Sequence, residues 1–176
     1  MEIELKLRIR EPPDLSNYKK IYEGIEVDTY YNHPCRDFSR TDEALRIRRR
    51  TGFEKAILTY KGPRAPSKVK IREEIELEVD EDKAKKLLER LGFKPIAVIK
   101  KRREVYIVDG AYVTIDRVEG IGLFMEIEAE SEEKVLSVWE KLGKIGEIEE
   151  KTYLELFLLH HRGAFGNLQE EVDERN

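Results

Sequence analysis

Hydrophobic and polar residues alternate along most of the chain. Residues 2–10 read Glu-Ile-Glu-Leu-Lys-Leu-Arg-Ile-Arg, so every second side chain is apolar. A period of two places the apolar side chains on one face of a β-strand and the charged side chains on the other. The same pattern predicts further strands over residues 25–32, 44–50, 53–61, 69–79, 95–108, 111–118 and 122–130.

Helical signals interrupt this alternation. Apolar residues recur at helical spacing over residues 81–91, where Asp80 is a suitable N-cap and Gly92 a suitable residue to follow the helix. Thr152 and Glu155 have the spacing of a capping box. The other predictions are a short helix near 14–22, capped by Asp14 or Ser16, a polar loop over 35–43 and a helix over 131–142.

Eight strands and a few helices within 176 residues favour an α+β fold. The strands can form either an antiparallel β-barrel or a sandwich, with the helices flanking them. One domain is expected over residues 1–162, followed by a mobile polar tail over residues 163–176.

Composition narrows the function. Charged residues make up 40% of the chain, against about a quarter in ordinary domains. The 33 basic and 37 acidic residues give a net charge of −4, which argues against a general nucleic-acid binder but not against a small basic pocket. Abundant Glu, Lys and Arg beside a single Gln resemble proteins from high-temperature organisms. One cysteine and no long apolar stretch predict a cytoplasmic protein that does not enter a membrane.

The charges are sorted by strand. Basic residues concentrate at 46–50, 61, 70–72 and 100–102, whereas carboxylates concentrate at 2–4, 116 and 126–130. Any single strand could be the solvated side of an ordinary antiparallel sheet. A solvated face usually mixes both signs, so the sorted set instead predicts a lumen with a basic wall and an acidic wall. On strand 95–108 we expect Lys100 and Arg102 to face inward and Lys101 and Arg103 to face outward.

Such a lumen suits a triphosphate. Several cations are needed to offset its charge, and arginine binds phosphate oxygens through two hydrogen bonds. Clustered carboxylates repel one another unless a cation lies between them. Mg²⁺ or Mn²⁺ fills this role with one or two carboxylates and phosphate oxygens as ligands. The pattern therefore predicts metal-assisted phosphoryl or nucleotidyl transfer.

The N-terminal Glu2-Ile3-Glu4-Leu5-Lys6 resembles the E-x-E-x-K signature of the CYTH superfamily, the triphosphate tunnel metalloenzymes. Further matches follow in order over about residues 1–155: Asp28-Thr29-Tyr30-Tyr31, Leu45-Arg46-Ile47-Arg48, Thr59-Tyr60-Lys61-Gly62-Pro63, Arg72-Glu73-Glu74-Ile75-Glu76, Lys100-Lys101-Arg102-Arg103, Asp116, and Met125-Glu126-Ile127-Glu128. The Asp-Thr-Tyr-Tyr segment and the Lys-Gly-Pro turn look most similar to the class IV adenylyl cyclase branch.

The resemblance implies an eight-stranded tunnel, a homodimer and roles for particular residues. The implied ligands of one or two divalent metal ions, Mg²⁺ or Mn²⁺, are Glu2, Glu4, Asp116, Glu126 and Glu128. The implied triphosphate-binding residues are Lys6, Arg46, Arg48, Lys61, Lys100, Arg102 and Lys151, and Arg72 joins them because it shares their basic face. Our candidate catalytic residues are Glu2, Glu4, Lys6 and Glu74, of which Glu74 matches a supporting acidic position.

Three functions remain open at this point. The first is a class IV adenylyl cyclase-like enzyme that converts ATP to cyclic AMP and pyrophosphate. The second is a triphosphatase that hydrolyses tripolyphosphate, a nucleoside triphosphate or thiamine triphosphate. The third is a non-catalytic module that binds polyphosphate or nucleotide. The partner is in each case a nucleoside triphosphate or inorganic polyphosphate, and no residue type in the sequence separates the two reactions.

Overall fold

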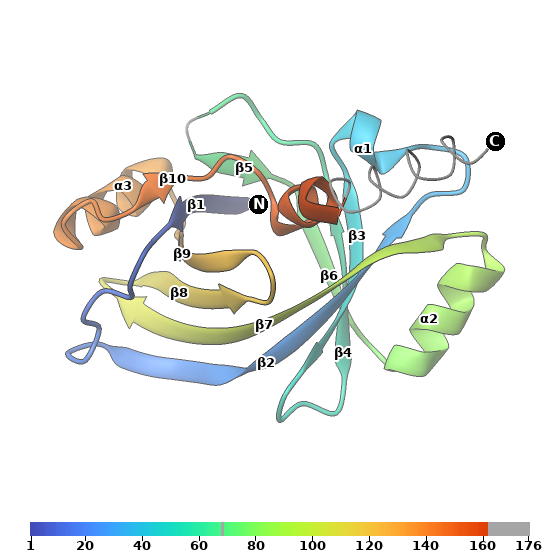
Figure 1. Cartoon of the computed structure of the whole chain (residues 1–176), viewed down its shortest axis with the longest axis horizontal. Helices are drawn as coiled ribbons and strands as arrows, with labels where there is room; N and C mark the ends of the chain where they lie inside the picture. Colours follow the sequence, from blue (N-terminus) through green and yellow to red (C-terminus); the bar gives the residue numbers. More distant parts are fainter. Residues whose placement is uncertain (68, 162–176) are drawn as a thin grey trace, which may run out of the picture.

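Ten strands form one antiparallel sheet that curves into a nearly closed barrel (Figure 1). This computed structural model describes residues 1–67 and 69–161. The strands are β1 (Glu2–Arg8), β2 (Lys19–Asn32), β3 (Ala44–Arg50), β4 (Ala56–Lys61), β5 (Lys70–Arg72), β6 (Glu74–Val79), β7 (Lys94–Val108), β8 (Ala111–Val118), β9 (Gly122–Glu128) and β10 (Glu147–Ile148). Nine of them are hydrogen-bonded in the order β10-β1-β9-β8-β7-β2-β3-β4-β6, and β5 pairs with β1.

The segment 70–79 brings the two ends of this sheet together. Its first part, β5, pairs with β1 and sets Arg72 opposite Glu2, whereas its second part, β6, pairs with β4 and sets Glu74 opposite Lys61. If β5 and β6 are taken as one strand broken at Glu73, eight strands surround the barrel and β10 lies beside β1. The predicted α+β barrel is therefore confirmed, although the strand count differs from eight.

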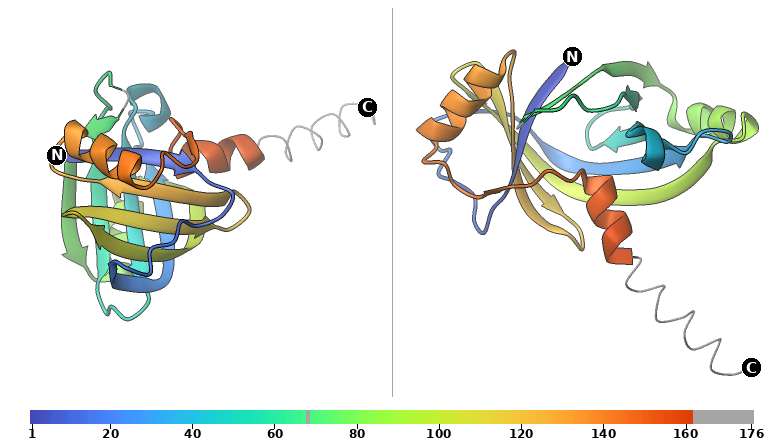
Figure 2. Two further views of the ribbon diagram at one scale, coloured as in Figure 1. Left: turned by 90° about the vertical axis from the view of Figure 1, so that its left-hand side faces the viewer. Right: turned by 90° about the horizontal axis from the view of Figure 1, so that it is seen from above.

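Three helices pack on the outer, apolar face of the barrel: α1 (Phe38–Thr41), α2 (Glu81–Arg90) and α3 (Glu132–Lys141). A further helix over residues 153–161 enters the barrel at Tyr153, which packs with Tyr30, Ile99 and Phe124. Helix α3 packs through Val135 and Val138 on the apolar side chains of β1, β8 and β9, and α2 packs through Ala84 and Leu88 on those of β3. These two helices lie at opposite ends of the molecule (Figure 2). The inner face is left to the charged side chains.

The predicted caps are confirmed. The Asp80 and Ser131 side chains accept hydrogen bonds from the backbone N–H groups of Lys83 and Lys134. The capping box forms in both directions: Thr152 N–H donates to Glu155 and Glu155 N–H donates to the Thr152 hydroxyl, at 2.6 and 3.1 Å.

The predicted helix over residues 14–22 is wrong. Asp14 accepts a hydrogen bond from the N–H of Ser16 in a local turn, and β2 begins at Lys19. Lys20 and Tyr22 pair with β7, so a long-range ladder replaces the helix. The expected loop 35–43 contains the one-turn helix α1, capped by Asp37. The predicted tail 163–176 lies outside the described residues.

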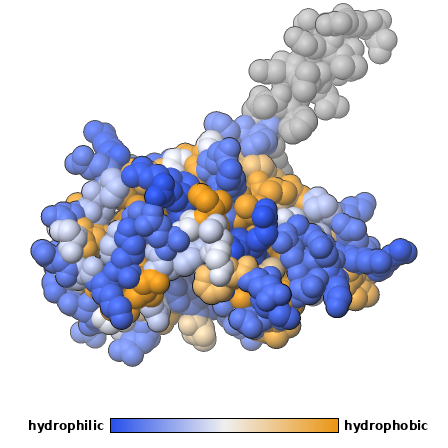
Figure 3. All heavy atoms as spheres, turned by 90° about the horizontal axis from the view of Figure 1, so that it is seen from below, coloured by the Kyte–Doolittle hydropathy of each residue, from blue (hydrophilic) through white to orange (hydrophobic). Residues whose placement is uncertain are grey.

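The outer surface is strongly charged. The face seen in Figure 3 is mostly hydrophilic, with small apolar patches between charged side chains. Across residues 1–67 and 69–161, none of the helices is both long and apolar enough to cross a lipid bilayer.

Candidate functional site

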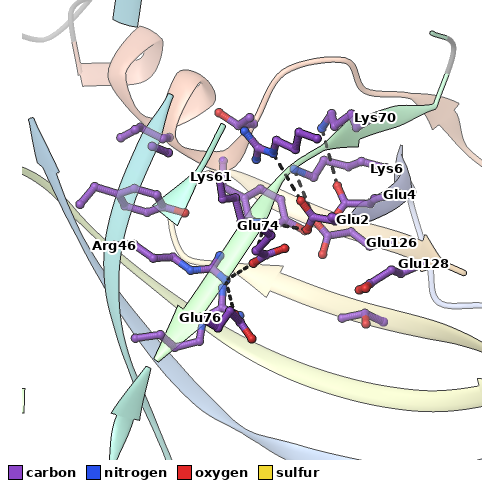
Figure 4. Close-up of a pocket in the computed structure, with 18 of the residues that line it drawn as sticks. Glu2, Glu4, Lys6, Arg46, Lys61, Lys70, Glu74, Glu76, Glu126 and Glu128 are labelled. Carbon is purple, nitrogen blue, oxygen red and sulfur yellow. Dashed lines mark hydrogen bonds and ion pairs between the residues drawn. The ribbon is translucent and has the colours of Figure 1, made fainter. Parts of the chain in front are cut away.

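A cavity of about 190 Å³ opens inside the barrel (Figure 4). Each of the strands β1 to β9 contributes to its walls, together with residues 152–154 at the start of the last helix. Because side chains alternate along each strand, one face of each strand supplies the charged lining while the other supplies the core. The labelled side chains in Figure 4 point toward one another across this space.

Seven cations line the cavity among the described residues. They are Lys6 on β1, Arg46 and Arg48 on β3, Lys61 on β4, Lys70 and Arg72 on β5, and Arg103 on β7. Lys61 and Arg72 hold the two oxygens of Glu2 at 2.6 and 3.3 Å. Arg46 makes only long contacts, at 3.7 and 3.8 Å, with Glu74 and Glu76. Its Nε is buried and has no hydrogen-bond partner among the described residues. A buried donor without an acceptor is costly, so this group is poised to bind an anion.

The carboxylates that face these cations differ in their pKa values. Burial would raise the pKa of Glu2, but Lys61 and Arg72 hold this pKa at about 2. Burial and the nearby Glu126 raise the pKa of Glu4. Burial, with repulsion from Glu2, Glu4 and Glu74, raises the pKa of Glu128 to about 7. Glu4 and Glu128 therefore lack enough positive charge nearby.

These carboxylates fit a hard divalent cation. Their donors are all oxygens, which Mg²⁺ and Mn²⁺ prefer. In the part of the chain that the structure describes, no three His, Cys, Asp or Glu side chains already form a metal-binding group. Mg²⁺ does not require such a group, because it is usually held by one or two carboxylates, substrate phosphates and water. The raised pKa values of Glu4 and Glu128 indicate where positive charge is missing.

A layer of mutually paired charges lies beside the cavity. Arg48 donates two hydrogen bonds to Asp28, at 2.7 and 2.8 Å, and Lys101 donates a third at 2.7 Å. Arg103 binds Asp116 through Nε at 2.7 Å and also contacts Glu126 at 2.8 Å. Although burial opposes it, the pKa of Asp28 is well below its usual range because Arg48 and Lys101 are close. We call this set the ionic layer: Asp28, Arg48, Lys101, Arg103, Asp116 and Glu126.

Tyr153 connects the last helix to both the ionic layer and the cavity. Its hydroxyl donates to Asp116 at 2.8 Å, and its ring lies 3.8 Å from the Lys6 ammonium and in edge contact with Phe124. The capping box at Thr152 and Glu155 starts the helix at the point where Tyr153 enters the barrel. Cation–π contact and burial together orient Lys6 toward the cavity.

Comparisons with known proteins agree with this architecture. The model of the CYTH domain matches residues 1–155. The chain belongs to the CYTH family. Proteins of this family are typically enzymes that act on triphosphates and depend on divalent metal ions.

Relatives of the chain cover most of its length. A Methanocaldococcus jannaschii protein that is provisionally named an adenylate cyclase is 36% identical, over 89% of this chain and 98% of its own. The structure of a Pyrococcus horikoshii protein, PH1819, matches with 42% identity and a TM-score of 0.76, over 90% of this chain and 98% of that one. HpAC1 from Hippeastrum shares the fold at 22% identity and a TM-score of 0.72, over 89% of this chain and 95% of that one. It is provisionally named an adenylyl cyclase and described as having a dominant triphosphatase activity.

Most of the residues predicted for a CYTH site meet in the cavity. The lining contains the predicted residues Glu2, Glu4, Lys6, Arg46, Arg48, Lys61, Arg72, Glu74, Glu126 and Glu128. Several of them are already engaged with one another or with neighbouring charges: Glu2 with Lys61 and Arg72, Arg48 with Asp28, and Glu126 with Lys6 and Arg103. The cavity therefore brings both predicted walls together, with Arg46, Glu4 and Glu128 the least satisfied of them.

The predicted orientation of β7 is wrong. Lys100 and Arg102 point away from the cavity, each with a side chain 57% exposed, whereas Lys101 and Arg103 point inward. The run Lys-Lys-Arg-Arg offers a cation on both faces, so alternation alone does not determine which pair is inside. Pairing with β8 decides it, because Arg103 lies opposite Asp116 and cross-strand partners share a face.

Two more predicted residues lie apart from the cavity. Asp116 is fully buried in the ionic layer, and its oxygens are occupied by Arg103 and by the Tyr153 hydroxyl. This arrangement leaves it poorly placed as a metal ligand. The Lys151 side chain is absent from the cavity lining, although its backbone carbonyl accepts a hydrogen bond from Lys70 at 3.3 Å.

The lining also includes residues that we did not predict as site residues. Lys70 and Glu76 have the same parity as Arg72 and Glu74, so strand alternation was sufficient to find them. Tyr30 is adjacent to the Asp28-Thr29 segment on the inner face of β2. Tyr153 has no such signal, because its position depends on how the last helix docks on the barrel.

We predict that Asp28→Asn destabilises the protein by about 3–5 kcal/mol, because it leaves Arg48 and Lys101 buried without a full counter-charge. Guanidinium denaturation would measure the loss. The control is Glu140→Gln, which removes an exposed ion pair with Lys144 and should barely move the midpoint. An Asp28→Asn variant as stable as the unmodified protein would contradict a structural role for the ionic layer.

The raised pKa of Glu128 should make the stability of the folded protein depend on pH. Its pKa is about 7 in the fold against 4.5 for the unperturbed group, so the folded chain binds the proton more tightly than the unfolded chain. The folded state therefore loses stability as pH rises from about 4.5 through 7. Glu128→Gln should raise the melting temperature more at pH 8 than at pH 5, both in EDTA. The exposed Glu130→Gln is the control, and equal shifts at both pH values would contradict this assignment.

Proposed function

We propose that this CYTH protein is a metal-dependent enzyme that binds ATP through its triphosphate and converts it to cyclic AMP and pyrophosphate, as class IV adenylyl cyclases do. The observation that carries the proposal is the buried Arg46 Nε without a hydrogen-bond acceptor, set among Lys61, Lys70 and Arg72. Four cations that converge on an enclosed space provide enough charge for a triphosphate, which is the most highly charged part of the nucleotide.

The opposite wall supports a metal-dependent reaction. Glu4 and Glu128, assisted by Glu2 and Glu126, would hold Mg²⁺ or Mn²⁺ beside the phosphate oxygens. The bound ion would supply further neutralisation of the charge that develops on phosphorus and on the leaving group. Arg46, Lys61 and Arg72 orient the phosphates from the other side, so the phosphate chain lies between the two walls.

In this reaction the ribose 3′-oxygen forms a bond to the α-phosphorus as the bond from that phosphorus to the bridging oxygen breaks. Pyrophosphate leaves with the electron pair of that bond, and the 3′-hydroxyl proton is released. Most of the catalytic effect in such a transfer comes from positioning and from stabilisation of charge. The rigid ionic layer beside the cavity keeps the cations fixed while the phosphate charge redistributes.

The names of relatives support a cyclase reaction, and one protein of the same fold is described as a triphosphatase. The M. jannaschii relative and an Aeromonas hydrophila protein, CyaB, carry the name adenylate cyclase. HpAC1, which shares only the fold at this identity, was described as a triphosphatase. A triphosphatase would use the same walls while water attacks the γ-phosphorus, so it is the second candidate, with tripolyphosphate, nucleoside triphosphates or thiamine triphosphate as substrates.

The first test is incubation with ATP, and separately with tripolyphosphate, in Mg²⁺ or Mn²⁺, followed by chromatography of the products. Cyclic AMP and pyrophosphate are expected from ATP.

Glu4→Gln should lower turnover at least about 100-fold and reduce the thermal stabilisation that metal and tripolyphosphate give together. Glu130→Gln, outside the cavity, should preserve both. ADP or phosphate without cyclic AMP would indicate the triphosphatase, and binding without turnover would indicate a non-catalytic module.

A matched pair of arginine variants tests the triphosphate site. Arg46→Ala should weaken tripolyphosphate binding roughly 10- to 100-fold, because a charged hydrogen bond to phosphate is lost. Arg102→Ala removes the same charge from the outer face of β7 and should leave affinity within about twofold. Isothermal titration calorimetry would measure both. Equal losses in the two variants would mean that binding depends on net charge rather than on the cavity.

A further inference from the structure

A second cavity, of about 300 Å³, adjoins the charged one. It lies between α1, the end of β2, the start of β7 and the last helix. Four residues line both cavities: Ala44, Arg72, Thr152 and Leu154. A single ligand can therefore extend from one cavity into the other past this shared wall.

The second cavity has a different lining from the first. Tyr31, Phe38, Ile96, Leu154 and Leu158 provide two aromatic rings and three branched aliphatic side chains. Tyr31 and Phe38 are fixed in the apolar cluster beneath α2, so this wall is already formed. Apolar and aromatic walls with a few polar groups are typical of sites for organic ring systems.

Carboxylates make up half of the polar residues that line this cavity. Asp37, Asp42, Glu43 and Glu155 line it, and Arg72 at the shared wall is the one cation among its described lining residues. Arg64 fixes two of the carboxylates, Asp42 and Glu155, at 2.6 and 2.9 Å and so joins α1 to the last helix. Arg36 pairs with a third carboxylate, Glu43, so the rim has neither the unpaired donor of the first cavity nor a surplus of cations for phosphate. Its carboxylate oxygens can still accept hydrogen bonds from amino groups. The two adjoining cavities therefore prefer opposite ends of a nucleotide.

We propose that this second cavity is the nucleoside subsite, which takes the amine-bearing heterocycle of the triphosphate substrate. The inference rests on the proposed function and adds to it the place where the nucleoside of the substrate binds. With the base beside Tyr31 and Ile96 and the phosphates beside Arg46 and Lys61, the ribose and α-phosphate lie at the shared wall. Arg72 is then the cation closest to the α-phosphate, where a cyclase makes its new bond.

Filling the cavity tests this assignment. Ile96 lines it and is 38% exposed, so Ile96→Trp can add volume without disturbing the core. The matched control is Val98→Trp, two residues further along β7, 56% exposed and outside the lining. Affinities for ATP and tripolyphosphate would be measured by calorimetry in EDTA, so that no turnover interferes.

Ile96→Trp should weaken ATP binding by about tenfold or more and leave tripolyphosphate binding within about twofold, while Val98→Trp should change neither. Leu158→Trp, from the last helix, should reproduce the ATP-specific loss if the cavity is the cause. Unchanged ATP affinity in both filling variants would overturn the proposal, as would equal losses for both ligands. A loss seen with thiamine triphosphate but not with ATP would also overturn the nucleoside assignment.

Failure of the proposed function would look different. In that case the unmodified protein would form no cyclic AMP from ATP with metal present, whatever its affinity for ATP in EDTA. If tripolyphosphate binds and ATP binds no better, with Ile96→Trp without effect, the triphosphate site stands and only the nucleoside subsite is lost.

Discussion

The structure depends on one electrostatic constraint: charged side chains that point into a barrel must each find a counter-charge, because the interior solvates ions poorly. Closure of the barrel removes these side chains from water, and it also brings their counter-charges within reach. When β5 pairs with β1, Arg72 arrives opposite Glu2, and Lys61 reaches the same carboxylate from β4. The ladders that close the sheet thus also bring together charges that lie about 60 to 70 residues apart.

Counter-charges are distributed unevenly along the barrel. Fully paired side chains stabilise the fold, whereas incompletely paired side chains remain available to a ligand. Asp28, Arg48 and Lys101 satisfy one another in short hydrogen bonds, so they hold the strands in place and have little capacity left for a ligand. Arg46 keeps a donor without an acceptor, and Glu4 and Glu128 repel neighbouring carboxylates. A triphosphate with a divalent cation would satisfy both sides at once. The unliganded protein is therefore least stable electrostatically at the point where the substrate would bind.

Much of this arrangement could be predicted from the sequence, because alternating apolar and charged residues identify the outer and inner faces of a barrel strand. The faces of β1, β3 and β9 were predicted from Glu2, Arg46 and Glu126, and the caps at Asp80 and Ser131 were predicted from local chemistry. Alternation failed where both faces carried the same residue types, as at Lys100 to Arg103, because only the pairing with β8 distinguishes them. It also could not place Tyr153, whose burial against Lys6 and Asp116 is a matter of tertiary docking.

The same physics explains why the charged cavity does not by itself select a reaction. Arg46, Lys61 and the carboxylates stabilise negative charge on any phosphate of the chain, so they serve attack at the α-phosphorus and at the γ-phosphorus alike. Which phosphorus meets a nucleophile depends on how far the chain slides along the cations. That position must be set by contacts outside the charged cavity. The apolar cavity beyond Ala44 and Leu154 is where the structure offers such contacts. An anchored heterocycle would hold the ribose 3′-hydroxyl in position to attack the α-phosphorus, whereas a bare tripolyphosphate, which has no group to anchor, could only be hydrolysed.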